Sequence, residues 1–286
     1  MSVTSSVGAV RARTTRLGAG SVLAFLALSA YVLVATDATK LLGIAWVAFA
    51  AMAAGAAVGA RASTEHPTGL VWGYGLASGA MVASSAAFLV PQATGYAAKP
   101  GGFGVAAGIL VGFGAHTVGH RLAHRELPLD RTTAELTAHA LAAGSIIGVV
   151  YTAMPDLGPL LGLAIVSHKA PAGYAAARRL SADGRSPAML LLPASGVGLA
   201  ALGVTQVAVP TDPAVRAAVF GFAAGIFLHV AMDFLPHCET GSDVHAAATR
   251  AGHEHDHDLL DRLRVQAVLS TAAGGLAVAA AWLVVQ

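Results

Sequence analysis

The stretch GLVWGYGLASGAMVASSAAFLVP, residues 69–91, decides the fold class. None of its residues is charged, and a run of about 20 apolar residues is long enough to cross the hydrocarbon core of a bilayer as a helix. The rest of the chain has the same character, since 56% of its 286 residues are hydrophobic, 11% are charged and its mean hydropathy is +0.67. We therefore predict an all-α, polytopic transmembrane helix bundle.

Similar apolar segments recur along the chain and predict about nine spans. They lie at residues 18–36, 41–60, 69–91, 101–120, 132–152, 158–177, 187–208, 215–235 and 265–285. If the N-terminus is cytoplasmic, thirteen basic residues fall in inner loops and three in outer loops, as the positive-inside rule requires. We expect a multi-pass protein of the cell membrane with its C-terminus outside. The first span also fits a signal sequence, because RARTTR at 11–16 precedes it.

The charges and the single cysteine exclude several kinds of partner and site. The net charge of +2 comes from loop arginines, which report membrane topology, so we expect the lipid bilayer and no nucleic acid as a partner. Cys238 alone cannot form a disulfide within the chain or a Cys-rich zinc site. A metal ion would therefore be held by His, Asp, Glu or Met side chains.

Two of the predicted spans each carry one histidine five residues ahead of a glycine. His139 begins HALAAG, which ends at Gly144, and His168 begins HKAPAG, which ends at Gly173. An ionisable side chain inside a membrane is costly, so two histidines at matched offsets indicate a buried polar site for a metal ion or a proton. Packing histidines that bond to nearby carbonyl groups are the structural alternative.

These two motifs resemble those of the ZIP (Zrt/Irt-like protein) family of divalent-metal transporters, whose two central spans carry H-N-x-x-E-G and H-x-x-P-E-G. GIFLHVAMDFLPH at 225–237 is similar to the family's G-x-F-L-Y-V-A-x-x-D-x-L-P-E, and the segments 75–93 and 193–203 also resemble family spans. The resemblance covers residues 41–286. It divides the chain into an N-terminal tail with an extra span, residues 1–36, and a ZIP-like transporter domain of eight spans, residues 37–286.

The resemblance implies a transporter that moves a divalent transition-metal ion, zinc first, into the cytoplasm by alternating access. This sequence departs from the family at its oxygen ligands, because Ala143 and Ala172 stand where the motif glutamates bridge two metal ions. Ala140 and Leu199 replace two further polar positions of the family. Two neutral imidazoles are a poor zinc site alone, so we do not expect a family-like binuclear centre.

The remaining candidate ligands come from four spans and one loop. His139 and His168 are the first choice, and Pro171 is expected to break the helix near them by removing a backbone hydrogen bond. The other metal-site candidates are Met81, His229, Asp233, His253, His255 and His257. Lys169 lies within a span and is expected either to extend toward the membrane surface or to face a carboxylate.

Three histidines and three acids alternate in GHEHDHD, residues 252–258, within the polar cytoplasmic loop 237–264. In a flexible loop they can chelate zinc-type ions, which indicates an acceptor or sensing role, and a solvated charged linker is the alternative. A third group, His116, His120 and His124, follows one helix face. The arginines beside it favour an interfacial polar face over a metal site.

Other function classes fit less well. A di-iron oxygenase or desaturase needs an H-x-x-H-H box, which the chain does not contain. An intramembrane metalloprotease needs H-E-x-x-H on a helix within a span, whereas the string of that form here, residues 253–257, lies in the polar loop 237–264. We therefore expect no enzymatic activity and no resident cofactor. The stronger rival is a ZIP-derived membrane protein that no longer transports and keeps a sensing or structural role. The sequence is also compatible with a homodimer.

Overall fold

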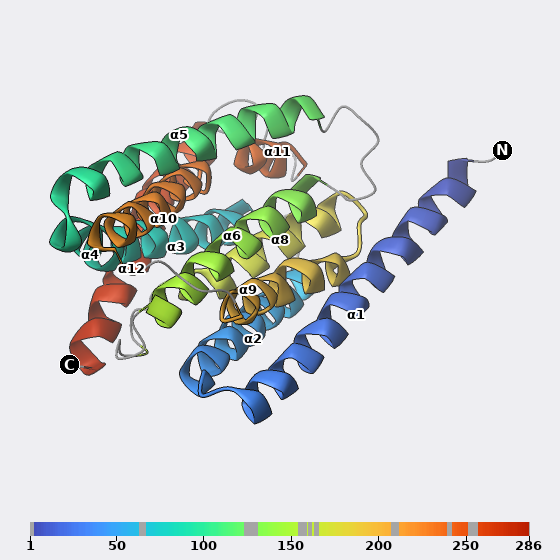
Figure 1. Cartoon of the computed structure of the whole chain (residues 1–286). Coiled ribbons are helices and arrows are strands. Elements are labelled where there is room, and N and C mark those ends of the chain that lie inside the picture. Colours follow the sequence, from blue (N-terminus) through green and yellow to red (C-terminus); the bar gives the residue numbers. More distant parts are fainter. Residues whose placement is uncertain are drawn as a thin grey trace.

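The computed structural model of the chain describes residues 3–62, 67–122, 131–153, 159, 162, 166–206, 212–238, 242–250 and 257–285 (Figure 1). At some positions, residues 3–15 among them, only the backbone is described. Every element in the described ranges is a helix, and none of the described residues lies in a strand. The prediction of an all-α bundle is confirmed.

The helices follow the apolar segments closely. Their bounds are α1 Val3–Ala35, α2 Thr39–Arg61, α3 Pro67–Ser84, the π-helix η1 Ser85–Leu89, α4 Val90–Tyr96, α5 Ala98–Leu122, α6 Arg131–Ala153, α8 Lys169–Ala182, the 3-10 helix η2 Pro187–Leu190, α9 Leu191–Val204, α10 Pro213–Asp233, α11 Asp243–Arg250 and α12 His257–Val285. The segment 69–91 is thus the middle of one continuous helical stretch, formed by α3, η1 and α4.

Eight helical stretches of the described chain are long and apolar enough to cross a membrane. They are α1, α2, α3 continued by η1 and α4, α5, α6, η2 continued by α9, α10 and α12. This arrangement is that of a multi-pass membrane protein. The ninth expected span, 158–177, falls partly on residues outside the described ranges, and its second half lies in the 14-residue helix α8. That span stays a prediction.

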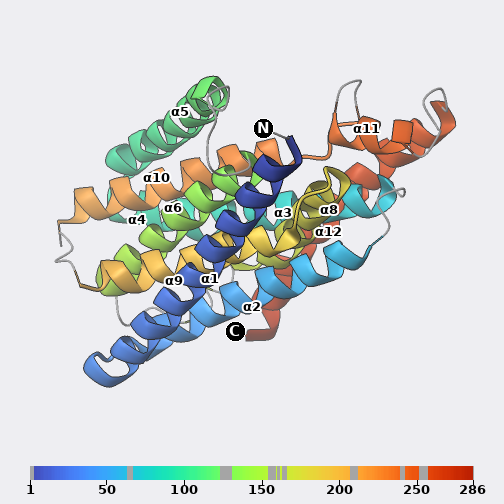
Figure 2. The same ribbon diagram turned by 90° about the vertical axis from the view of Figure 1, so that its right-hand side faces the viewer.

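The long helices form two groups. In the first, which we call the histidine group, α2 packs on α8 and on α9, α6 packs on α9, and α1 packs on α9. In the second, the α10 group, α10 packs on α5, α4 and α3, and α3 packs on α12. The groups meet mainly where α3 contacts α8 and α10 contacts α6. Figure 2 shows α5 at one edge of the bundle, with α10 between it and the histidine group.

Glycines allow backbones to touch inside each group. At Gly59 of α2 an added Cβ would overlap the carbonyl oxygen of Tyr174 in α8, and at Gly79 of α3 it would overlap that of Thr271 in α12. Such contact is how helices associate in lipid, where burial of apolar surface gives little driving force. The high glycine content of the chain is therefore used for helix packing within the groups.

The first helix, α1, is seated in the histidine group. Phe25 is fully buried, its ring centroid lies 4.8 Å from that of Trp46 in α2, and it fills the space above Gly198 in α9. The hydroxyl of Ser195 in α9 donates to Ser21 Oγ at 2.8 Å. Figure 1 shows α1 at the edge of the bundle beside α2 and α9. Its contacts are those of an integral helix of this group.

Candidate metal site and its cavity

The two motif histidines meet. His139 lies on α6 and His168 is the residue that precedes α8, and their Nε2 atoms are 3.4 Å apart. Two nitrogens that each bind one zinc ion at about 2.0–2.1 Å and at the tetrahedral angle lie roughly 3.3 Å apart. The same separation admits a hydrogen bond between neutral imidazoles. The pair can therefore share either one metal ion or one proton.

His168 lies in a turn that interrupts the helical structure just before α8. Ser167 and His168 form a turn, and the carbonyl oxygen of His168 accepts from the backbone N–H of Ala172 at 3.0 Å. Pro171 lies in the first turn of α8, where backbone N–H groups have no intrahelical acceptor. The expectation that Pro171 breaks the helix by removing a hydrogen bond is therefore wrong. The break comes earlier, at His168, and Pro171 suits the start of the new helix.

Phe227 of α10 covers the histidine pair from the other helix group. Its side chain is fully buried, and its ring centroid lies 5.6 Å from that of His139 and 5.6 Å from that of His168. The ring meets His168 nearly edge to face, at 85°. This aromatic contact joins the two groups at the site.

A buried lysine lies near the pair. Lys169 is only 3% exposed and is close enough to His139 to interact with it electrostatically. His168 itself is 1% exposed and stands at the N-terminal end of α8, which carries a partial positive charge. The start of α8 therefore places this partial positive charge beside the pair.

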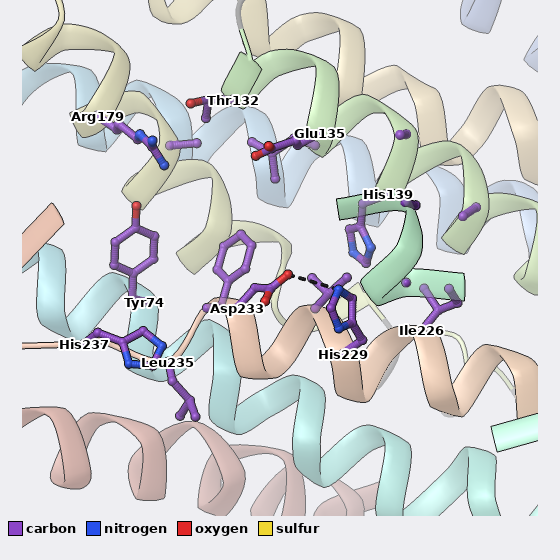
Figure 3. Close-up of a pocket in the computed structure, with 18 of the residues that line it drawn as sticks. Tyr74, Thr132, Glu135, His139, Arg179, Ile226, His229, Asp233, Leu235 and His237 are labelled. Atoms are coloured by element: carbon purple, nitrogen blue, oxygen red, sulfur yellow. Dashed lines mark ion pairs between the residues drawn. The ribbon is translucent and has the colours of Figure 1, made fainter. Parts of the chain in front are cut away.

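A cavity of about 620 Å³ reaches His139 (Figure 3). Its walls come from both helix groups and are mostly apolar. The lining residues are Tyr74, Val111, Gly112, Ala115, Thr132, Glu135, Leu136, Ala138, His139, Ala142, Ala176, Arg179, Phe222, Ile226, His229, Val230, Asp233, Phe234, Leu235, His237, Ser242 and Val244. His168 does not belong to this wall, so a molecule in the cavity meets His139 first.

His229 and Asp233, predicted as path residues, face this cavity as a pair. His229 Nε2 lies 3.3 Å from Asp233 Oδ2, one turn apart on α10. An added Cβ at Gly112 would lie 2.5 Å from the His229 ring, so the small residue on α5 makes room for the imidazole. Figure 3 shows the pair across the cavity from His139, with Glu135 and Arg179 farther along the opposite wall.

The other predicted ligands are not in the cavity wall. Met81 is fully buried in the core cluster that also contains Phe227, and its role as a ligand stays a prediction. Ala143 and Ala172 are also buried in that core. His253 and His255 lie outside the described residues, as does the side chain of His257 at the start of α12. The same holds for His124 and for the side chains of His116 and His120.

Within the described residues no group of three or more His, Cys, Asp or Glu side chains could hold a metal ion. Cys238 adds no ligand, because it lies apart in a small cluster with Val71, Val244 and Leu263. Burial raises the pKa of its thiol, although the charge of Arg264 opposes that shift. The thiol stays protonated at neutral pH, whereas a metal ligand is a thiolate.

Sequence reasoning missed three residues of this site. Phe227 stands two positions before His229 in the quoted motif. Glu135 is the only acid in the span 132–152 and precedes His139 by four residues, so helical periodicity puts both on one face. Arg179 was counted only as a loop charge. Of the three, Glu135 could have been found from its spacing to His139 alone.

Comparison with known proteins adds no assignment to this geometry. No protein-family model matches the chain, and no curated protein matches it.

Proposed function

We propose that this protein is a membrane transporter that moves a divalent transition-metal ion, zinc, into the cytoplasm. The observation that carries the proposal is the 3.4 Å separation of His139 Nε2 and His168 Nε2, which matches two nitrogens on one tetrahedral zinc ion. His168 is buried and His139 is half-buried. Ionisable residues inside a membrane are costly, and such residues line ion paths in membrane proteins. The resemblance of their motifs to those of ZIP transporters supports the same reading.

The cavity is the cytoplasmic half of the proposed path. Its wall includes Asp233 at the end of α10 and His237 just beyond this helix, which the distribution of basic residues assigns to the cytoplasmic side. An ion that leaves His139 would pass the His229–Asp233 pair on its way out. The histidine-rich loop, residues 252–258, would then serve as a weakly selective acceptor.

The division into two helix groups supports alternating access. Both histidines belong to the histidine group, whereas Phe227, which covers them, belongs to the α10 group. A displacement of one group against the other would uncover the pair without changing the distance between the two imidazoles. The site would thus be exposed to one side at a time.

A second candidate is a ZIP-derived protein that senses metal or has a structural role without transport. The observation in its favour is the lack of a third His, Cys, Asp or Glu ligand beside the pair among the described residues. Ala143 and Ala172 occupy the positions where ZIP transporters carry glutamates.

Uptake of zinc-65 into proteoliposomes that contain the purified protein separates the two candidates. We expect uptake by the wild type and at least a tenfold loss in the double variant His139→Ala, His168→Ala. His245→Ala is the matched control and should keep full uptake, because His245 on α11 belongs neither to the pair nor to the residues that line the cavity. Failure of the wild type to take up zinc, iron, manganese or cobalt would favour the sensing or structural role.

A further inference from the structure

The histidine pair leaves half of a zinc coordination sphere open. Structural and catalytic zinc sites hold the ion with four ligands, or with three protein ligands and one exchangeable ligand. His139 and His168 give two neutral nitrogens, and the described part of the chain places no carboxylate or thiolate with them. The remaining positions are therefore open to a ligand that arrives with the ion.

The immediate surroundings of the pair do not neutralise a dication. Both imidazoles are neutral ligands, and the N-terminal end of α8 adds partial positive charge beside His168. Arg179 lies in the cavity wall together with two acids, Glu135 and Asp233, and Asp233 is already paired with His229 at 3.3 Å. Since neutral ligands leave the full charge on the ion, a cargo that brings its own anionic groups would be better tolerated.

The cavity is too large for an ion alone. Six waters around a divalent ion occupy roughly 180 Å³ at about 30 Å³ each, whereas the cavity measures about 620 Å³. Sites for small organic molecules typically measure about 300–1,000 Å³ and have apolar walls with a few polar groups. This description fits the wall, where Phe222, Ile226 and Leu136 accompany Glu135 and Arg179.

We propose that the cavity binds zinc as a complex with a small hydroxy- or amino-carboxylate chelator, whose metal ion docks on His139. This inference rests on the transport function proposed above and names the form of its cargo. The chelator's carboxylates neutralise the ion and occupy part of its coordination sphere. The imidazole of His139 takes one open position, and the imidazole of His168, whose Nε2 lies 3.4 Å from that of His139, takes the next. The organic part lies between α5 and α6, against the apolar wall.

The test holds the free zinc concentration constant and varies only the complex. Proteoliposomes receive zinc-65 without chelator, or with the same free zinc plus zinc–citrate or zinc–iminodiacetate, each chelator labelled with carbon-14. We expect at least threefold faster zinc uptake with either complex and entry of about one chelator per additional zinc ion. Preformed zinc–EDTA, whose six donor atoms leave no position for His139, should add nothing.

The outcomes separate this inference from the transport function itself. Zinc uptake that depends on free zinc alone, without entry of carbon-14, overturns the proposal of a chelate cargo and leaves zinc transport standing. The absence of zinc uptake in every medium overturns the transport function and the chelate cargo with it.

A matched pair of variants on α5 tests the place of binding. Ala115 lines the cavity, whereas Ala107 is exposed outside its wall. Ala115→Leu narrows the cavity, so we expect it to lower the chelator-dependent uptake at least fivefold, and more strongly than the uptake of free zinc. Ala107→Leu should leave both rates unchanged. Equal effects of the two variants, or an equal loss of both uptake components in Ala115→Leu, would contradict binding in this cavity.

Discussion

The helices within each group touch through their backbones, whereas the two groups touch through side chains. Inside the histidine group Gly59 lies against the backbone of Tyr174, and inside the α10 group Gly79 lies against that of Thr271. Between the groups the Phe227 ring packs on two imidazoles. The Tyr174 ring covers Gly73 of α3, where an added Cβ would lie 2.8 Å from it.

This difference indicates that the boundary between the two groups can change its packing more easily than the contacts inside each group. A backbone contact at a glycine fixes the register of two helices, because a shift brings a Cβ into the path. Aromatic rings can rotate or slide over one another at lower cost, since they have several favourable arrangements. The cavity, whose wall draws on both groups, lies along the same boundary. Under the proposed alternating access, the groups would move as units and this boundary would open and close.

The largest expected effect follows from adding one methyl group inside the α10 group. A Cβ at Gly79 would overlap the Thr271 carbonyl, whereas at Gly275, on the facing helix α12, its nearest neighbour would be 3.6 Å away. We expect Gly79→Ala to lower the free energy of unfolding by about 4 kcal/mol and to deplete folded protein. Gly275→Ala should cost less than about 1 kcal/mol. Thermal unfolding in detergent, followed by size-exclusion chromatography, measures both.

Similar stabilities of the two alanine variants would contradict the view that helices within a group are fixed by backbone contacts at glycines. Equal stability of Gly79→Ala and Gly275→Ala would mean that α3 and α12 can separate without cost. The α10 group could not then be treated as one unit.

Much of this fold could be read from the sequence because bilayer thickness sets the length of a span. Uncharged segments such as residues 69–91 therefore gave the helices directly. The assignment of the helices to two groups could not be read in this way. It depends on which glycine faces which backbone, and the many glycines and alanines of this chain make most helix faces look alike.

The site was predictable in part. Matched offsets singled out His139 and His168, and helical spacing put His229 beside Asp233. Spacing along one span does not tell which side chains of other spans converge on it. The position of Met81, which is buried in the core and does not line the cavity, could not be derived from spacing. Phe227 escaped notice because an aromatic residue in an apolar span has no distinguishing pattern.

A smaller effect tests whether α1 belongs to the histidine group. Phe25 is fully buried between α2 and α9, whereas Leu23 on the same helix is 66% exposed. We expect Phe25→Ala to cost about 3 kcal/mol of stability and to make α1 accessible to protease near its N-terminal end. Leu23→Ala should change neither property. Unaltered stability and protease resistance of Phe25→Ala would show that α1 is only loosely attached.

The smallest expected effect concerns the ion itself and uses the alanines one turn beyond each histidine. Ala143 follows His139 by four residues, and Ala172 follows His168 by four, so a carboxylate at either position shares a helix face with its histidine. We expect Ala143→Glu and Ala172→Glu to raise zinc affinity about tenfold, or about 1.4 kcal/mol, as measured by isothermal titration calorimetry. Without zinc both variants should unfold at lower temperature, because each buries an unpaired carboxylate.

Zinc should restore more stability to these two variants than to the wild type, because an ion that binds only the folded state stabilises it. Ala201→Glu is the matched control, since Ala201 is an equally buried alanine of the same core and lies on α9. Its loss of stability should not be relieved by zinc. Because both histidines and both alanines belong to the histidine group, a gain in Ala143→Glu and Ala172→Glu alone would mean that this group holds the ion without the α10 group. If zinc stabilised all three variants equally, the result would contradict binding of the ion by the histidine group.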